Sequence, residues 1–382
     1  MPAPVLEHRF RNSSKANLER KWRVEKVAFA DRVRRWAAWP SVQIRLDLDT
    51  RCNLRCEFCS TGHAGNVDRA PFPEPDLETA FRVAGREAWS VFLSCGGEPL
   101  LHPAFERTMA LTWKHLRHLD VQMVTNATLL NEAKAKAILD SNLSRIFFSV
   151  DSVDAERYAR LRPGAVWETT RHNIERFMEL RGKAKWPRVT VIMILMKENQ
   201  EELETVANFC EGIGVDAFRV QHLATFADVP TTLGSAEDTP EMRRRLLRLQ
   251  WRLFRRRIVF DHPFALRLEK CLSLLATVRL YRNPWGYLKY LVGGAWGALT
   301  SPCRRVGWEA TVYRDGRYSS CVGIADVPWD PKGKTSFLRY LRQSRHRHSR
   351  ASFPGCDGCT FHRPEKRHAS RATSKLSGDA QL

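Results

Sequence analysis

The chain has 382 residues, of which 43 % are hydrophobic, enough for a sizeable core and too many for a wholly disordered protein. Lys and Arg number 62 against 42 Asp and Glu, and the resulting net charge of +20 suits an anionic partner such as nucleic acid, a phosphorylated small molecule or a membrane surface. A solvated, arginine-rich surface without such a partner explains the charge equally well.

The ten cysteines are expected to be reduced. The N-terminal residues lack the apolar segment of a signal peptide, and no apolar run approaches the roughly 18 residues of a membrane-spanning helix. We therefore expect a cytoplasmic protein, in which cysteines bind metal or lie buried rather than form disulfides.

Strands and helices alternate over much of the first 230 residues. Residues 1–40 are basic and helix-like, and we predict that they form an N-terminal extension. Strands are predicted at 42–49, 90–95, 120–125, 145–151, 188–195 and 215–223. The helices between them imply a parallel sheet with right-handed crossovers, either an open doubly wound sheet or a partial barrel. In both folds the chemistry belongs at the carboxyl ends of the strands.

Residues 231–300 break this alternation and are predicted to form a helical insert. Its segment 241–260 is a basic amphipathic helix that mixes Arg with Leu, Trp and Phe, as helices at anionic membrane surfaces do. A helix packed on the barrel with an arginine-rich outer face is the alternative. Residues 301–362 carry further cysteines, and the polar, basic tail 363–382 is predicted to be disordered.

Three cysteines follow the first predicted strand with the spacing C-x3-C-x2-C: Cys52, Cys56 and Cys59. A closed structural zinc site takes four ligands, and this loop supplies three. An iron–sulfur cube held by three thiolates keeps one iron open for a substrate or cofactor. The spacing therefore favours a cluster that takes part in chemistry over a structural metal.

This loop, with Phe58 before its last cysteine, resembles the cluster loop of radical S-adenosylmethionine (SAM) enzymes. Three later motifs at predicted strand ends strengthen the resemblance: Gly96-Gly97-Glu98-Pro99, SVDS at 149–152, and Thr125-Asn126-Ala127, where alanine replaces the family's glycine. The resemblance covers about residues 41–230. It implies an α/β fold, a partial (βα)6 TIM-like barrel.

The resemblance also implies a cofactor, a reductant and a set of contacts. The open iron of a [4Fe–4S] cluster would bind SAM, and an electron from a flavodoxin- or ferredoxin-type reductant would cleave it to a 5′-deoxyadenosyl radical that abstracts a substrate hydrogen. The loop cysteines would hold the cluster. The resemblance assigns the contacts with SAM to Phe58, Gly96, Gly97, Glu98, Asn126, Ser149, Arg162 and Val220. Glu98 suits the methionine ammonium, and Arg160 rivals Arg162 for the methionine carboxylate.

Four cysteines in the C-terminal part form a second candidate site: Cys303, Cys321, Cys356 and Cys359. The YRDGRY stretch between the first two predicts a hairpin with an Asp-Gly turn, which would bring them together. Four thiolates hold either zinc or an iron–sulfur cluster. The pattern C-x12-G-x4-C followed by C-x2-C resembles the Twitch domain, a shortened SPASM domain, and implies an auxiliary [4Fe–4S] cluster in a small Cys-rich hairpin and helix domain.

An auxiliary cluster with full thiolate ligation is expected to carry electrons. The enzyme would then be an oxidoreductase that performs a net two-electron oxidation. Such a reaction needs a proton acceptor, for which Asp228 and Asp261 are candidates by position only. By analogy with Twitch enzymes that oxidise a sugar-like alcohol, we expect a small sugar-like or anionic biosynthetic precursor as substrate.

Other functions stay open. Peptide modification is one of them, although few residues precede the first strand for the peptide-binding domain that such enzymes often carry. Molybdopterin-type GTP chemistry fits less well, because that family's C-terminal cluster uses three cysteines and its chain ends in two glycines, whereas this chain ends in GDAQL. A non-catalytic iron–sulfur or nucleic-acid-binding protein would use the positive charge but has no need of an open iron beside Glu98.

Overall fold

The structure, a computed structural model, describes residues 42–59, 61–62, 69–94, 96–223, 231–262, 280–281, 287, 309–312, 317–319 and 327–328. The predicted N-terminal extension, the predicted tail, Asp228 and the four C-terminal cysteines lie outside these residues. Within the described ranges, no helix combines the length and apolar character needed to cross a membrane.

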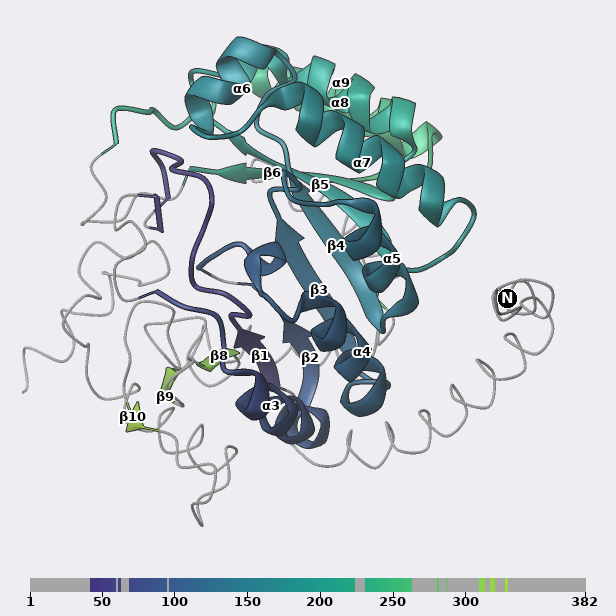
Figure 1. Cartoon of the computed structure of the whole chain (residues 1–382). Helices are drawn as coiled ribbons and strands as arrows, with labels where there is room; N and C mark the ends of the chain where they lie inside the picture. The colour runs from purple at the N-terminus through teal and green to yellow at the C-terminus, as the bar shows by residue number, and fades with distance from the viewer. Residues whose placement is uncertain are drawn as a thin grey trace, which may run out of the picture. The chain divides into compact units, whose positions relative to one another are not determined.

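A curved sheet organises the described part of the chain (Figure 1). Seven of its described strands are parallel and neighbour one another in chain order: β1 (Val42–Leu46), β2 (Ala88–Phe92), β3 (Asp120–Thr125), β4 (Leu143–Ser149), β5 (Arg188–Leu195), β6 (Ala217–His222) and β7 (Val259–Asp261). The first six lie where the sequence predicts them. The seventh comes from the predicted helical insert, so that segment is not wholly helical and extends the sheet beyond the six expected strands.

The other edge of the sheet is extended as well. β8 (Glu309–Val312) pairs in parallel with β1. It also pairs antiparallel with β9 (Arg317–Ser319), with Val312 opposite Tyr318, and β9 pairs with β10 (Val327–Pro328). β8 and β9 flank the predicted Asp-Gly turn in the sequence, and the turn itself lies outside the described residues.

Helices connect the parallel strands and lie along one side of the sheet (Figure 1). They are α3 (Glu74–Glu87), α4 (Phe105–His115), α5 (Glu132–Asp140), α6 (Ala155–Leu161), α7 (Trp167–Arg181), α8 (Leu203–Ile213) and α9 (Pro240–Arg255), with the 3-10 turns η2 (Pro99–Leu101) and η3 (Gln200–Glu202). Side chains cap three of these helices at their first turn: Asn131, Asp154 and Thr239 each accept a hydrogen bond from a backbone N–H three residues on.

The main apolar core lies between the sheet and these helices. In β4, Ile146 and Phe148 are fully buried, as is Val150 just after it, and the ring of Phe148 meets Phe177 of α7 edge-on at 5.4 Å between ring centres. Burial of such a side chain contributes about 1.5–3 kcal/mol to folding. This packing fixes the strands, and with them the loops that leave their carboxyl ends.

The opposite face of the sheet carries arginine and phenylalanine side chains, because successive strand residues point to opposite faces. Phe147 stacks on Phe92 at 5.9 Å between ring centres. The guanidinium groups of Arg145 and Arg219 lie 5.5 and 5.7 Å from the centre of the Phe147 ring, and that of Arg45 lies 5.5 Å from the Phe92 ring. Cation–π contacts stabilise positive charge on apolar rings.

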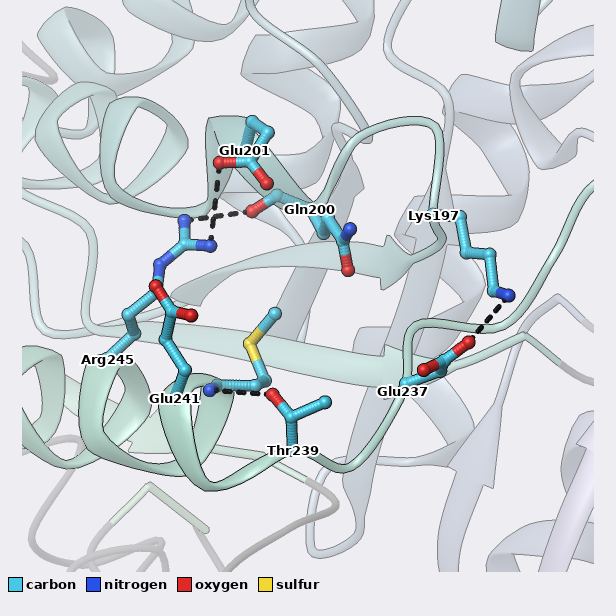
Figure 2. A pocket seen from close by; sticks show the side chains of 8 residues that line it. Lys197, Gln200, Glu201, Glu237, Thr239, Glu241 and Arg245 are labelled. Atoms are coloured by element: carbon cyan, nitrogen blue, oxygen red, sulfur yellow. Dashed lines mark hydrogen bonds and ion pairs between the residues drawn. The ribbon is translucent and has the colours of Figure 1, made fainter.

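A polar cleft of about 260 Å³ lies where α9 meets the connection from β5 to α8 (Figure 2). Arg245 of α9 binds the carboxylate of Glu204 through two nitrogens, at 2.9 and 2.6 Å, and the carbonyl of Gln200 at 3.0 Å. Lys197 binds Glu237 at 2.7 Å. Because these charges neutralise one another, we assign the cleft a structural role in holding α9 against α8.

Replacing Arg245 with alanine is expected to lower the free energy of unfolding at pH 7 by about 1 kcal/mol, since Glu204 stays partly exposed and water screens the pair. The hydrogen bond from Arg245 lowers the pKa of Glu204. The stabilisation is therefore present above the unfolded glutamate pKa of about 4.3 and is lost as the pH falls through the lower folded value. Denaturant unfolding at pH 7 and at pH 3 measures it, with exposed Arg244→Ala as control. A difference that persists at pH 3 would contradict this account.

Candidate functional site

The predicted motifs meet at the carboxyl ends of β1 to β3. Glu98 donates its backbone N–H to the carbonyl of Arg51, just before Cys52, at 2.8 Å, and its carboxylate accepts the N–H of Asn126 at 2.8 Å. Asn126 in turn donates its side-chain amide to Asn53 at 3.0 Å. Hydrogen bonds therefore join the loops after three different strands into one site.

The loop after β1 presents three free thiols, with Cys56 buried and Cys52 and Cys59 half-buried. The N–H of Cys59 donates to the carbonyl of Cys56 at 3.1 Å, and the N–H of Leu54 lies 3.4 Å from the Cys52 sulfur. Burial raises the pKa of Cys52 and that of Cys56, the latter to about 12, whereas nearby Arg162 lowers both. Cys52 and Cys56 therefore stay protonated until a metal centre favours the thiolate form.

This donor set fits an iron–sulfur cluster. Cys52, Cys56 and Cys59 are three free thiols of one loop. Cys thiolates hold such clusters. In the [4Fe–4S] cluster that the resemblance implies, these three residues would bind three irons and leave one iron open.

Glu98 is buried beside the cysteine loop, with 2 % of its surface exposed. Its carboxylate accepts hydrogen bonds from the Thr125 hydroxyl at 2.6 Å, the Asn126 N–H at 2.8 Å and the Leu100 N–H at 3.1 Å. Burial raises the pKa of Glu98, although these hydrogen bonds oppose the shift. A carboxylate offers about four lone-pair sites, so this one is held in a fixed orientation with acceptor capacity left for a ligand.

Gly97 packs against the backbone that leads into the cysteine loop. A Cβ atom on Gly97 would overlap the carbonyl of Asp49 and lie 2.7 Å from the carbonyl oxygen of Arg51. On Gly96, a Cβ atom would meet only the Asp47 carboxylate, at 3.5 Å. The resemblance implies that both glycines let SAM come close to the backbone. In the structure, Gly97 also packs against residues 49–51.

The turn after β3 holds its alanine in a left-handed conformation. Ala127 has φ of 62°, a region that favours glycine, and it is fully buried. Asn173 of α7 donates to the Ala127 carbonyl at 2.9 Å, and the N–H of Thr128 donates to the Asn126 side chain at 3.0 Å. Sequence reasoning missed Asn173 and Thr128, because a polar residue in an amphipathic helix or a turn looks like a surface residue.

Arg162 and Asp151 form a buried ion pair of 2.6 Å, with side chains 7 % and 0 % exposed. Burial disfavours the charge of Arg162, but Asp151 and Cys56 outweigh burial and raise the pKa of Arg162. The guanidinium also lies 5.6 Å from the ring centre of Phe58 in the cysteine loop. Arg160, its rival for the SAM carboxylate, is exposed on α6. The structure therefore brings Arg162 to the cysteine loop and leaves Arg160 at the surface.

The remaining predicted residues lie on β4, β6 and β7. Ser149 is half-buried at the end of β4. Asp261 of β7 is ion-paired with Arg219 of β6 at 2.9 Å. Val220 is 3 % exposed and belongs to the core on the helix side of the sheet. Its side chain therefore points away from a ligand on the other face, and only its backbone is left for the predicted adenine contact.

Part of this chain is similar to known proteins. Residues 49–210 match the Radical SAM superfamily. A tungsten-containing aldehyde ferredoxin oxidoreductase cofactor-modifying protein of Pyrococcus furiosus is 28 % identical over 185 residues, 47 % of this chain and 50 % of that protein. A GTP 3′,8-cyclase of Aquifex aeolicus is 27 % identical over 190 residues, 48 % of this chain and 57 % of that protein. The chain spans about half the length of the curated relatives it matches.

Solved structures share the fold over a larger part of the chain. SuiB of Streptococcus suis bound to S-adenosylmethionine has a TM-score of 0.61 at 16 % identity and covers 84 % of this chain and 71 % of its own. Native anSMEcpe with bound AdoMet has a TM-score of 0.55 at 17 % identity and covers 84 % of this chain and 87 % of its own. Residues 49–210, which match the Radical SAM superfamily, contain the cysteine loop, Glu98 and Arg162.

Proposed function

We propose that the chain is a radical SAM enzyme, with Cys52, Cys56 and Cys59 as ligands of a [4Fe–4S] cluster. Such a cluster, when bound and reduced, supplies the electron that cleaves SAM to a 5′-deoxyadenosyl radical. One observation carries the proposal: the cysteine loop, the buried carboxylate of Glu98 and the buried guanidinium of Arg162 come together at one end of the sheet.

The residues around the loop orient SAM. Glu98 uses its free lone pair to accept a hydrogen bond from the methionine ammonium, an interaction strengthened because water is excluded from this buried carboxylate. Arg162 binds the methionine carboxylate with donors that Asp151 does not occupy. The further proposed contacts with SAM are Phe58, Gly96, Gly97, Asn126, Ser149 and the backbone of Val220.

We further propose an auxiliary [4Fe–4S] cluster on Cys303, Cys321, Cys356 and Cys359, and a net oxidation of the substrate. The strands β8 and β9 support the first part, because they pair antiparallel and lie between Cys303 and Cys321 in the sequence. These four cysteines would hold the cluster in the domain of 301–362, where a fully ligated cluster would supply an acceptor for the electron left on the substrate radical.

The proposed substrate is a small anionic or sugar-like precursor. Ser149, Arg219 and Asp261 lie at one level of the sheet, joined through Ile192 of β5 in the register. Arg219 provides a fork of donors for a phosphate or carboxylate, and Asp261 is a candidate acceptor for a substrate proton, with Asp228 the other. A relative that acts on GTP, the GTP 3′,8-cyclase of Aquifex aeolicus, supports an anionic substrate.

A peptide-modifying maturase is the second candidate. SuiB bound to its precursor peptide SuiA and anSMEcpe bound to AdoMet and the Cp18Cys peptide share the fold, with TM-scores of 0.59 and 0.54. In the non-catalytic alternative, an iron–sulfur or nucleic-acid-binding protein, reduction in the presence of SAM yields no 5′-deoxyadenosine.

The test is anaerobic reconstitution followed by reduction with SAM present. The wild type is expected to hold about eight irons per chain and to form 5′-deoxyadenosine, and Cys52→Ala/Cys56→Ala/Cys59→Ala to hold about four and form none. Cys210→Ala, a buried thiol in α8, is the matched control and is expected to behave as the wild type. Product from the triple variant would refute the cluster assignment. If the wild type holds about four irons and the triple variant holds none, the auxiliary cluster is refuted, and with it the proposed oxidation.

A further inference from the structure

Helix α9 carries two apolar faces, although packing on the sheet uses only one. Its buried residues are Met242, Leu246, Leu249 and Leu253, spaced as one helical stripe. A second stripe, Leu247, Trp251 and Phe254, lies at positions i, i+4 and i+7 on another face, with 42 %, 60 % and 63 % of each residue exposed. The rings of Trp251 and Phe254 meet edge-on at 6.3 Å between centres. We call these three residues the outer stripe.

The outer stripe is a concentration of apolar surface. Five large hydrophobic residues of the described chain are exposed, and three of them form this stripe. The other two, Trp113 and Val166, lie apart from it on α4 and just before α7. Single exposed apolar residues are ordinary, whereas a contiguous group indicates an interaction surface.

Arginines border the outer stripe. Two arginines of α9 form ion pairs with α8: Arg245 binds Glu204 and Arg252 binds Glu211. Three others, Arg244, Arg248 and Arg255, are exposed beside the stripe and form no ion pair with any described residue. The surface therefore combines aromatic rings with exposed positive charge along one helix.

We propose that the outer stripe and its three bordering arginines dock this protein on an anionic lipid surface. A helix that lies in the membrane interface buries Trp, Phe and Leu at the boundary between headgroups and acyl chains and extends Arg to the lipid phosphates. The exposed face of α9 offers this arrangement, and the chain's net charge of +20 favours the approach. This inference does not depend on the proposed function.

The experiment is cosedimentation of the full-length, reconstituted protein with vesicles of phosphatidylglycerol and phosphatidylcholine, and with vesicles of phosphatidylcholine alone. Binding is expected only to the anionic vesicles, and it is expected to weaken at high salt. Leu247→Gln/Trp251→Gln/Phe254→Gln and Arg244→Gln/Arg248→Gln/Arg255→Gln are each expected to bind at least about tenfold more weakly.

The matched control removes three exposed positive charges elsewhere, as Arg82→Gln/Arg171→Gln/Lys183→Gln, and is expected to keep wild-type binding. Iron content and circular dichroism confirm that each variant is folded. No sedimentation of the wild type at low salt would overturn the proposal. So would wild-type binding by the Leu247/Trp251/Phe254 variant, or a loss of RNA affinity in the Arg244/Arg248/Arg255 variant with vesicle binding unchanged, which would identify a nucleic-acid surface instead.

Discussion

Gly97→Ala is expected to reduce SAM cleavage by on the order of 100-fold, because a small displacement of catalytic groups suffices for such a loss. The added methyl group would overlap the Asp49 carbonyl and stand 2.7 Å from that of Arg51; both are backbone atoms, so the segment 49–51 must move. That movement breaks the hydrogen bond from the Glu98 N–H to Arg51 and displaces Cys52, the next residue. Overpacking of this kind also costs about 1–3 kcal/mol of folding free energy.

Alanine substitutions at two other glycines test whether Gly97 matters through its packing or through its approach to SAM. Gly96→Ala places its methyl group 3.5 Å from the Asp47 carboxylate, so we expect normal iron content and stability but weaker SAM binding. A Cβ atom on Gly212 in α8 would have no other atom within 4 Å. Gly212→Ala is therefore expected to leave the free energy of unfolding unchanged or to raise it by up to about 1 kcal/mol. Iron content, urea unfolding and 5′-deoxyadenosine yield measure all three variants. Full iron and activity in Gly97→Ala would refute the packing role.

The parallel strands β1 to β6 were predictable because each is a short segment in which apolar residues recur, and helical segments separate one from the next. β7 was not, since its three residues are too short to show a period and directly follow an arginine-rich helix. Its identity as a strand comes from pairing with β6, which is tertiary context and leaves no local signal.

The meeting of the site's motifs was predictable for a related reason: each motif follows a strand, and parallel strands end at the same edge of the sheet. The contacts that fix the motifs were not. Gly97 packs on residues 49–51, and Arg162, just after α6, pairs with Asp151, just after β4. Such contacts depend on how separate loops pack in space, so the sequence presents Gly97 only as a flexible residue and Asp151 only as part of a strand end.

Arg162→Met is expected to destabilise the protein by about 3–5 kcal/mol, because it leaves Asp151 as an unpaired carboxylate in the core. The Asp151 side chain is fully buried and keeps one hydrogen bond, from the Ile194 N–H at 2.8 Å. Asp151→Asn removes this charge, so the double variant is expected to recover most of the loss. Denaturant unfolding of the wild type, the two single variants and the double variant gives the coupling energy. A coupling below about 0.5 kcal/mol would contradict the buried pair.

The same substitution has a pH-dependent consequence at Cys56. Burial raises the pKa of Cys56 to about 12 and Arg162 lowers it, so Arg162→Met moves this pKa further upward. Since the thiolate is the metal ligand, the pH of half-maximal iron incorporation is expected to rise in Arg162→Met. Arg162→Lys retains the charge and is expected to stay near the wild type, and Arg160→Gln, at an exposed position, is expected to change neither stability nor the profile. An unchanged profile in a destabilised Arg162→Met protein would show that Arg162 supports the fold without tuning the cluster ligands.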